Sequence, residues 1–133
     1  MTFVIDASIA VKWVLAEDGA DRAAALRELP DELIAPTLIT AEIGSAMRKR
    51  VVAKELTTAE AINAAGAATS LLDRLVPIPE LATRALTLAV ELRHPIYDCL
   101  YLALAQREDV ALITADIDLI AKAKAAKIKV RPL

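Results

Sequence analysis

The sequence predicts an α/β domain in which alanine-rich helices cover a small parallel sheet of four to five strands. Of the 133 residues, 56% are hydrophobic but only 3% are aromatic, which favours alanine-rich helices around an aliphatic sheet over a β sandwich. Short apolar runs alternate with helical patterns, and strands separated by helices imply parallel crossovers. The length corresponds to about one domain, so residues 1–133 are expected to form a single unit.

The first strand is predicted at residues 3–5, an apolar run typical of a strand that is covered on both faces. Asp6 ends it. Ser8 is expected to cap a helix that continues to residue 16. A second helix is expected over residues 20–29, because Pro30 stops it there.

The middle of the chain carries one short strand and two longer helices. A strand is predicted at residues 32–35, followed by an amphipathic helix over residues 37–52 with apolar residues at three- and four-residue steps. Thr57 stands three residues before Glu60, which is the signature of a capping box. The helix that begins there is expected to reach residue 75.

The last part of the chain repeats the alternation of strand and helix. Strands are predicted at residues 76–78, 111–114 and 128–130. Helices are predicted at residues 79–93, 96–107 and 116–126. Pro77 interrupts the first of these strands, which suits the edge of a sheet, and Asp116 is expected to cap the last helix.

Acidic residues follow the two clearest strands. Asp6 ends the first strand, Asp116 follows the strand at residues 111–114, and Asp118 lies two positions further on. Neighbouring parallel strands end at the same rim of a sheet, which is where open α/β sheets bind ligands. Asp6 and Asp116 are therefore expected to share one rim.

Two further acids fall on the packed sides of their helices. Leu38 and Ile39 are neighbours of Glu42 at helical spacing, and Tyr101 is a neighbour of Asp98. Each acid also has a plainer interpretation as a solvated strand end, a helix N-terminal carboxylate or half of an ion pair. Carboxylates that share a pocket, however, raise each other's pKa unless a cation lies among them. Their convergence therefore predicts a hard metal ion, Mg²⁺ or Mn²⁺, and no set of His and Cys suited to zinc accompanies them.

Several classes of protein fit the composition poorly. With a single cysteine, Cys99, the chain forms no internal disulfide, and a packed thiol in a reducing compartment is expected. No apolar run approaches the roughly 20 residues of a membrane span, so a cytoplasmic protein is expected. The formal net charge of −2 does not suit a strongly basic nucleic-acid binder, although it leaves room for a local basic rim. A hard divalent ion among carboxylates most often serves phosphate chemistry, so phosphodiester hydrolysis is predicted.

The chain resembles the PIN domain, specifically the VapC-type toxin ribonucleases of prokaryotic toxin–antitoxin pairs. The resemblance is carried by four blocks in the family's order, Phe3–Ser8 with Lys12-Trp13, Ala41–Ile43, Tyr97–Ala105 and Leu112–Asp116. It covers nearly the whole chain. It implies a doubly wound, three-layer α/β/α fold and Mg²⁺- or Mn²⁺-dependent endoribonuclease activity, with water as the attacking group.

The resemblance also implies roles for individual residues. The metal-site acids correspond to Asp6, Glu42, Asp98 and Asp116. Asp6 and Asp98 are the expected direct ligands, whereas Glu42 and Asp116 complete or orient the hydration shell of the metal. Ser8 and Thr114 fall on small hydroxyl positions that hold water or an acid in place, and Asp118 is a further candidate near them. The implied partners are RNA, a second copy of the chain in a homodimer, and a VapB-like antitoxin whose extended segment covers the acidic pocket.

Two other functions stay open. One is a non-catalytic PIN-like module that binds metal or a partner without cleaving, although the presence of all four acids speaks against it. The other is a phosphatase or phospho-acceptor domain with a strand-end aspartate as nucleophile. Ser8 stands where the dehalogenase-like pattern has a second aspartate, which disfavours that reading. Among the remaining polar residues, Tyr97 and Tyr101 are expected in the core, and His94 in a loop rather than as a general base.

Overall fold

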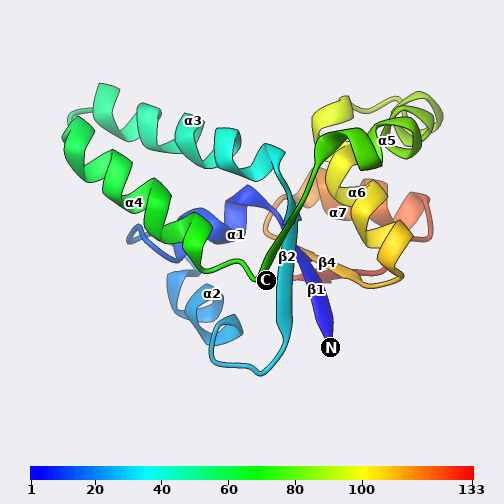
Figure 1. Cartoon of the computed structure of the whole chain (residues 1–133), viewed down its shortest axis with the longest axis horizontal. Coiled ribbons are helices and arrows are strands. Elements are labelled where there is room, and N and C mark those ends of the chain that lie inside the picture. The colour runs from blue at the N-terminus through cyan, green and yellow to red at the C-terminus, as the bar shows by residue number, and fades with distance from the viewer.

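The computed structural model describes residues 1–133 and contains a five-stranded parallel sheet flanked by helices (Figure 1). The strands are β1 (Thr2–Ile5), β2 (Glu32–Pro36), β3 (Arg74–Val76), β4 (Ala111–Thr114) and β5 (Val130–Pro132). They lie in the order β3-β2-β1-β4-β5, and every neighbouring pair is parallel. The predicted α/β/α architecture with a central parallel sheet is confirmed.

The seven helices connect the strands. They are α1 (Ala7–Lys12), α2 (Ala20–Leu26), α3 (Leu38–Val52), α4 (Thr58–Ser70), α5 (Ile78–Leu92), α6 (Ile96–Glu108) and α7 (Ile117–Ala125). Helices α3 and α4 pack together as one pair, and α5 and α6 pack as another. Figure 1 shows these two pairs on opposite sides of the view, with the strands between them. None of the helices is long and apolar enough to cross a membrane.

The strand order places a switch point beside β1. The chain first adds β2 and β3 on one side of β1 and then returns to add β4 and β5 on the other. Val4 pairs in register with Ile34 of β2 and with Leu112 of β4, and all three side chains are fully buried. Ligands of open α/β folds bind at such a switch point, beyond the carboxyl ends of the strands.

The core lies on both faces of the sheet, which explains why the central strands read as continuous apolar runs. One cluster joins Val4 and Leu112 to residues of α3 to α7, including the fully buried Ile43 and Leu102. The smaller cluster joins the alternate strand residues to α1 and α2. Its members are Phe3, Ile5, Ile9, Ala23, Leu26, Leu33 and Ile113.

Most predicted elements are present, and the differences lie at their ends. Helix α1 ends at Lys12 rather than at residue 16, and α2 ends at Leu26 rather than at residue 29. Helix α4 ends at Ser70, and β3 occupies Arg74–Val76 at the predicted edge of the sheet instead of residues 76–78. Pro77 is the reason for that shift, because proline cannot donate to a strand ladder and instead precedes the first turn of α5.

Candidate active site at the ends of β1 and β4

Asp6 lies directly after β1 and is 6% exposed. Its two carboxylate oxygens accept hydrogen bonds from two hydroxyls. Ser8 Oγ donates to Oδ1 at 2.6 Å, and Thr114 Oγ1 donates to Oδ2 at 2.6 Å. Burial raises the pKa of Asp6 to about 6, the hydrogen bonds from Ser8 and Thr114 oppose that rise, and the charge of Asp116 adds to it.

The prediction that Ser8 caps α1 is therefore wrong. Asp6 occupies the N-cap position of α1, and Ser8 lies in the first turn with its hydroxyl directed back to the Asp6 carboxylate. The Ser8 oxygen also accepts the backbone N–H of Ala115 at 3.2 Å. Its position links the start of α1 to the end of β4.

Asp116 lies just beyond β4 and caps α7, as predicted. Its Oδ1 accepts the backbone N–H groups of Asp118 and Leu119 at 2.9 and 3.3 Å. Its own backbone N–H donates to Thr114 Oγ1 at 3.0 Å. Asp118 is exposed in the first turn of α7, and its backbone rather than its carboxylate contacts Asp116.

Glu42 and Asp98 form a second pair of acids, on α3 and α6. Glu42 Oε1 accepts the Tyr101 hydroxyl at 2.6 Å, and Asp98 Oδ2 lies 2.7 Å from His94 Nε2. Burial raises the pKa of Glu42, and the charge of Asp98 raises it further, whereas the hydrogen bond from Tyr101 lowers it. The two carboxylates are thus close enough to interact.

Tyr101 lies between the two pairs. Burial and the neighbouring Glu42 raise the pKa of Tyr101, and the charge of Asp6 contributes to the same rise, so its hydroxyl remains a donor. The prediction that Tyr101 is a core residue is confirmed, because it is 1% exposed. The same prediction for Tyr97 is wrong, because Tyr97 is 61% exposed. Tyr97 lies in the first turn of α6, where Pro95 and Ile96 are exposed as well.

His94 is a residue of this region that sequence reasoning placed only in a loop. It does lie between α5 and α6, but its side chain is 8% exposed and contacts Asp98. The spacing of four residues between His94 and Asp98 was the signal available in the sequence.

The four predicted acids come together as two pairs, Asp6 with Asp116 and Glu42 with Asp98. None of the four forms an ion pair with lysine or arginine. No group of three or more His, Cys, Asp or Glu side chains is close enough to hold a metal ion in this arrangement, in which Asp98 faces His94 and Glu42 faces Tyr101. The donor chemistry of uncompensated carboxylate oxygens fits a hard divalent cation, and the ligand assignment stays a prediction.

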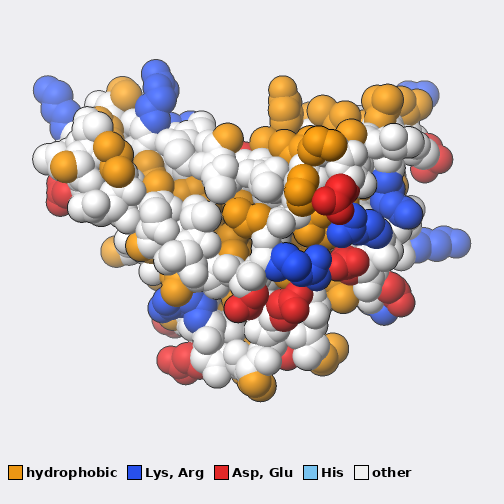
Figure 2. Space-filling model, viewed as in Figure 1, with side chains coloured by type: hydrophobic (Ala, Val, Ile, Leu, Met, Phe, Trp, Pro, Cys, Tyr) orange, Lys and Arg blue, Asp and Glu red, His pale blue; other side chains and the backbone are white.

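Two hollows adjoin α3, one between α1 and α3 and the other between α3 and α4. A hollow of about 420 Å³ between α1 and α3 has Glu42 on its wall together with Lys49 and Arg50. The charge of Arg50 is compensated there by ion pairs with Glu17 at 2.6 Å and with Glu55 at 2.8 Å. Separately from these two hollows, Figure 2 shows a depression of the surface between the helix pair α3 and α4 and helix α5.

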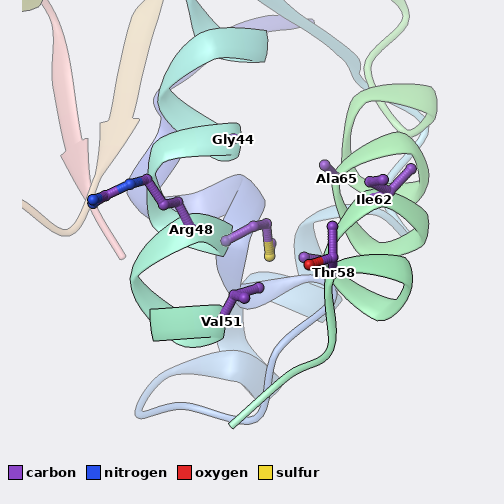
Figure 3. Close-up of a pocket in the computed structure, with 8 residues that line it drawn as sticks. Gly44, Arg48, Val51, Thr58, Ile62 and Ala65 are labelled. Carbon is purple, nitrogen blue, oxygen red and sulfur yellow. The ribbon is translucent and has the colours of Figure 1, made fainter. Parts of the chain in front are cut away.

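The second hollow, of about 290 Å³, is an apolar groove between α3 and α4. Figure 3 shows Val51 and Thr58 facing each other across the groove, whereas the side chain of Arg48 extends away from α4. Ile62 lies on the α4 wall and is 67% exposed. The groove is therefore an apolar surface open to solvent.

Comparisons with known proteins place the chain in a known family. Residues 3–125 match the PIN domain family. The chain is 40% identical over 117 residues to Ribonuclease VapC1 of Mycobacterium tuberculosis, covering 85% of this chain and 84% of that protein. The crystal structure of PAE2754 from Pyrobaculum aerophilum superposes with a TM-score of 0.70 at 25% identity, over 92% of this chain and 87% of that one.

Two further solved structures share the fold at lower identity. Mycobacterium tuberculosis VapC20, a toxin that cleaves the sarcin–ricin loop, has a TM-score of 0.72 at 17% identity and covers 90% of this chain and 93% of its own. VapBC2 from Rickettsia felis, solved with a DNA fragment from its promoter, has a TM-score of 0.72 at 14% identity, with 99% and 98% covered. These likenesses concern the arrangement of helices and strands.

Proposed function

The chain belongs to the PIN domain family, and from this premise we propose that it is a VapC-type toxin that hydrolyses RNA phosphodiester bonds with the help of a divalent cation. The observation that carries the proposal is the environment of Asp6. Its carboxylate is buried at the switch point of the sheet, has no cationic partner, and lies beside a second acid. Keeping such a carboxylate ionised costs free energy that a bound cation offsets.

The proposed roles follow from the family assignment and from the contacts of each residue. Asp6 and Asp98 are the proposed direct metal ligands, and Glu42 and Asp116 complete or orient the hydration shell. When bound, Mg²⁺ or Mn²⁺ supplies positive charge that lowers the pKa of water and stabilises developing charge on the phosphodiester oxygens. Ser8 and Thr114 hold the Asp6 carboxylate in one orientation through their hydroxyls, and Asp118 is the most peripheral candidate.

The proposed partners are cellular RNA, a VapB-like antitoxin and a second copy of the chain. VapC20 is named for cleaving an RNA loop, and several solved relatives are VapBC toxin–antitoxin proteins, which supports the first two. We assign the antitoxin to the apolar groove between α3 and α4, because apolar grooves between helices accept amphipathic segments. A toxin that acts on cellular RNA is expected to work in the cytoplasm.

Incubation of the purified protein with total RNA tests the proposed activity. Cleavage is expected with Mg²⁺ or Mn²⁺ and is expected to stop with EDTA or with Asp6→Asn. Asp21→Asn is the matched control, because it makes the same change at an exposed carboxylate on α2. Cleavage that persists in EDTA or in Asp6→Asn would contradict a mechanism based on these acids and a metal.

The separation of the four acids into two pairs favours one second candidate. A PIN-like module that binds metal or a partner without cleaving requires no single coordination shell. The same assay separates the two functions. Measurable Mn²⁺ binding without cleavage of any RNA in the total pool would support the binding module.

A further inference from the structure

We infer that Tyr101 is a positioning residue of the candidate active site, which holds Glu42 in place through its hydroxyl. The inference rests on the proposed function only in taking Glu42 as part of a divalent-cation site. Tyr101 is 1% exposed, so its ring is fixed by packing, and its hydroxyl lies 2.6 Å from Glu42 Oε1. A short bond from a hydroxyl to a carboxylate is among the stronger hydrogen bonds in proteins.

Glu42 and Tyr101 come from α3 and α6, two helices that pack mainly against different neighbours. Helix α3 packs mainly against α4 and α1, whereas α6 packs mainly against α5 and the central strands. The bond from Tyr101 to Glu42 spans 59 positions of the sequence and bridges these two helices. It therefore sets the position of the α3 acid relative to Asp98, which stands on α6 one turn before Tyr101.

Glu42 needs such a partner more than the three aspartates do. Asp6 is held by two hydroxyls, Asp116 by two backbone N–H groups, and Asp98 by His94. A glutamate side chain has more rotatable bonds and loses more freedom when it is fixed. The hydroxyl of Tyr101 removes that freedom before a cation arrives, which lowers the entropic cost of binding. It occupies one oxygen and leaves Oε2 of Glu42 without a hydrogen bond in the chain.

Tyr101→Phe tests the inference because it keeps the ring and removes only the hydroxyl. We expect the Kd for Mn²⁺, measured by isothermal titration calorimetry, to rise at least about tenfold, the usual effect of removing a group that orients a metal ligand. Tyr97→Phe is the matched control. It makes the same change one turn earlier on α6 at a tyrosine that is 61% exposed, and its Kd is expected to stay unchanged. An unchanged Kd in Tyr101→Phe would overturn the inference.

A double-mutant cycle distinguishes positioning from a purely structural role. If Tyr101 acts through Glu42, Tyr101→Phe causes no further rise of the Mn²⁺ Kd once Glu42→Ala, which removes the acceptor of the Tyr101 hydroxyl, is present. Additive rises would overturn the inference. Should Tyr101→Phe fail to fold, the hydroxyl proton of Tyr101 in the wild type gives a second measurement. Its NMR resonance is expected to shift on addition of Mg²⁺, and a resonance that does not move would count against the inference.

Failure of the inference and failure of the proposed function give different results. A wild type that binds Mn²⁺ but cleaves no RNA contradicts the ribonuclease proposal and leaves the Tyr101 measurement intact. A wild type that cleaves RNA, with equal Mn²⁺ affinity in Tyr101→Phe, contradicts the inference alone. A wild type without measurable affinity for Mn²⁺ contradicts the inference whatever the RNA assay shows.

Discussion

The hydroxyl of Thr114 donates to the Asp6 carboxylate at 2.6 Å, although 108 positions separate the two residues in the sequence. The same oxygen accepts the backbone N–H of Asp116 at 3.0 Å. One fully buried threonine at the end of β4 therefore joins the acid that follows β1 to the acid that follows β4. The pairing of β1 with β4 in the sheet is what brings these groups together.

Thr114→Val is expected to destabilise the fold and to raise the pKa of Asp6 above about 6. The change leaves a buried carboxylate oxygen and a backbone N–H without a partner, which costs roughly 1–3 kcal/mol. Urea denaturation measures the stability, and a ¹³C NMR titration of the Asp6 carboxyl measures its pKa. Thr87→Val is the control, because that hydroxyl lies exposed on α5 and bonds only to its own helix. An Asp6 pKa in Thr114→Val that equals the wild-type value, or lies below it, would contradict the expectation.

Local signals in the sequence were enough to locate several elements. The strand at residues 111–114 is present with the predicted bounds, and Thr57 with Glu60 forms the predicted capping box. Asp116 caps the last helix as expected. Each of these depends on residues within a few positions of one another, so no knowledge of the tertiary structure is needed.

Other features depend on contacts between distant segments, and the sequence could not show them. The role of Ser8 is one, because its oxygen accepts the backbone N–H of Ala115, 107 positions away in the sequence. The contact of Tyr101 with Glu42 is another, because it joins side chains of α6 and α3 that are 59 positions apart in the sequence. The sequence indicated correctly that Asp6 is buried, whereas Asp116 is exposed, and the orientation of each carboxylate is decided by partners such as His94.

The stability of the metal-free protein is expected to fall as the pH rises from about 4 to about 6. The pKa of Asp6 is 3.8 as an ordinary aspartate and about 6 in the fold, so in this range the folded state binds more protons than the unfolded state. The ionised form is thereby destabilised by about 3 kcal/mol, at about 1.4 kcal/mol for each pH unit between the two values. This stability is fully present below the lower value and lost above the upper one.

Asp6→Asn isolates that effect, because it removes the titrating group and keeps the shape of the side chain. The difference in unfolding free energy between Asp6→Asn and the wild type is expected to grow in favour of the variant between pH 4 and pH 6, and then to stay constant. Urea denaturation at a series of pH values gives this difference, in which the other titrating groups cancel. Parallel pH profiles for the two proteins would show that Asp6 titrates normally.

Addition of Mn²⁺ or Mg²⁺ is expected to raise the melting temperature of the wild type at neutral pH. A cation that binds only the folded state adds about 2.7 kcal/mol at a concentration of one hundred times its Kd. Differential scanning calorimetry with and without EDTA measures the effect. Asp98→Asn is expected to abolish most of it, whereas Asp21→Asn on α2 is expected to retain it. Equal shifts in both variants would indicate that the cation binds elsewhere.

Ile62→Glu is expected to prevent capture of the antitoxin without impairing cleavage of RNA by the free toxin. Ile62 is 67% exposed on the wall of the apolar groove between α3 and α4, so the fold tolerates a charge there. A helix seated in the groove would bury that charge without a partner, which is costly. Loss of a central apolar contact of this kind weakens binding by at least about 2 kcal/mol, or roughly 30-fold. Co-purification of the two proteins, followed by surface plasmon resonance, measures the loss.

Leu86→Glu serves as the control for the groove, because it places the same charge at a leucine that is 56% exposed on α5, outside the groove. If the antitoxin occupies the groove, its affinity is unchanged by Leu86→Glu and reduced by Ile62→Glu. The reverse order would move the antitoxin to the face of α5. Because neither residue touches the four acids, both variants are expected to cleave RNA at the wild-type rate. Loss of cleavage in Ile62→Glu alone would instead assign the groove to the RNA.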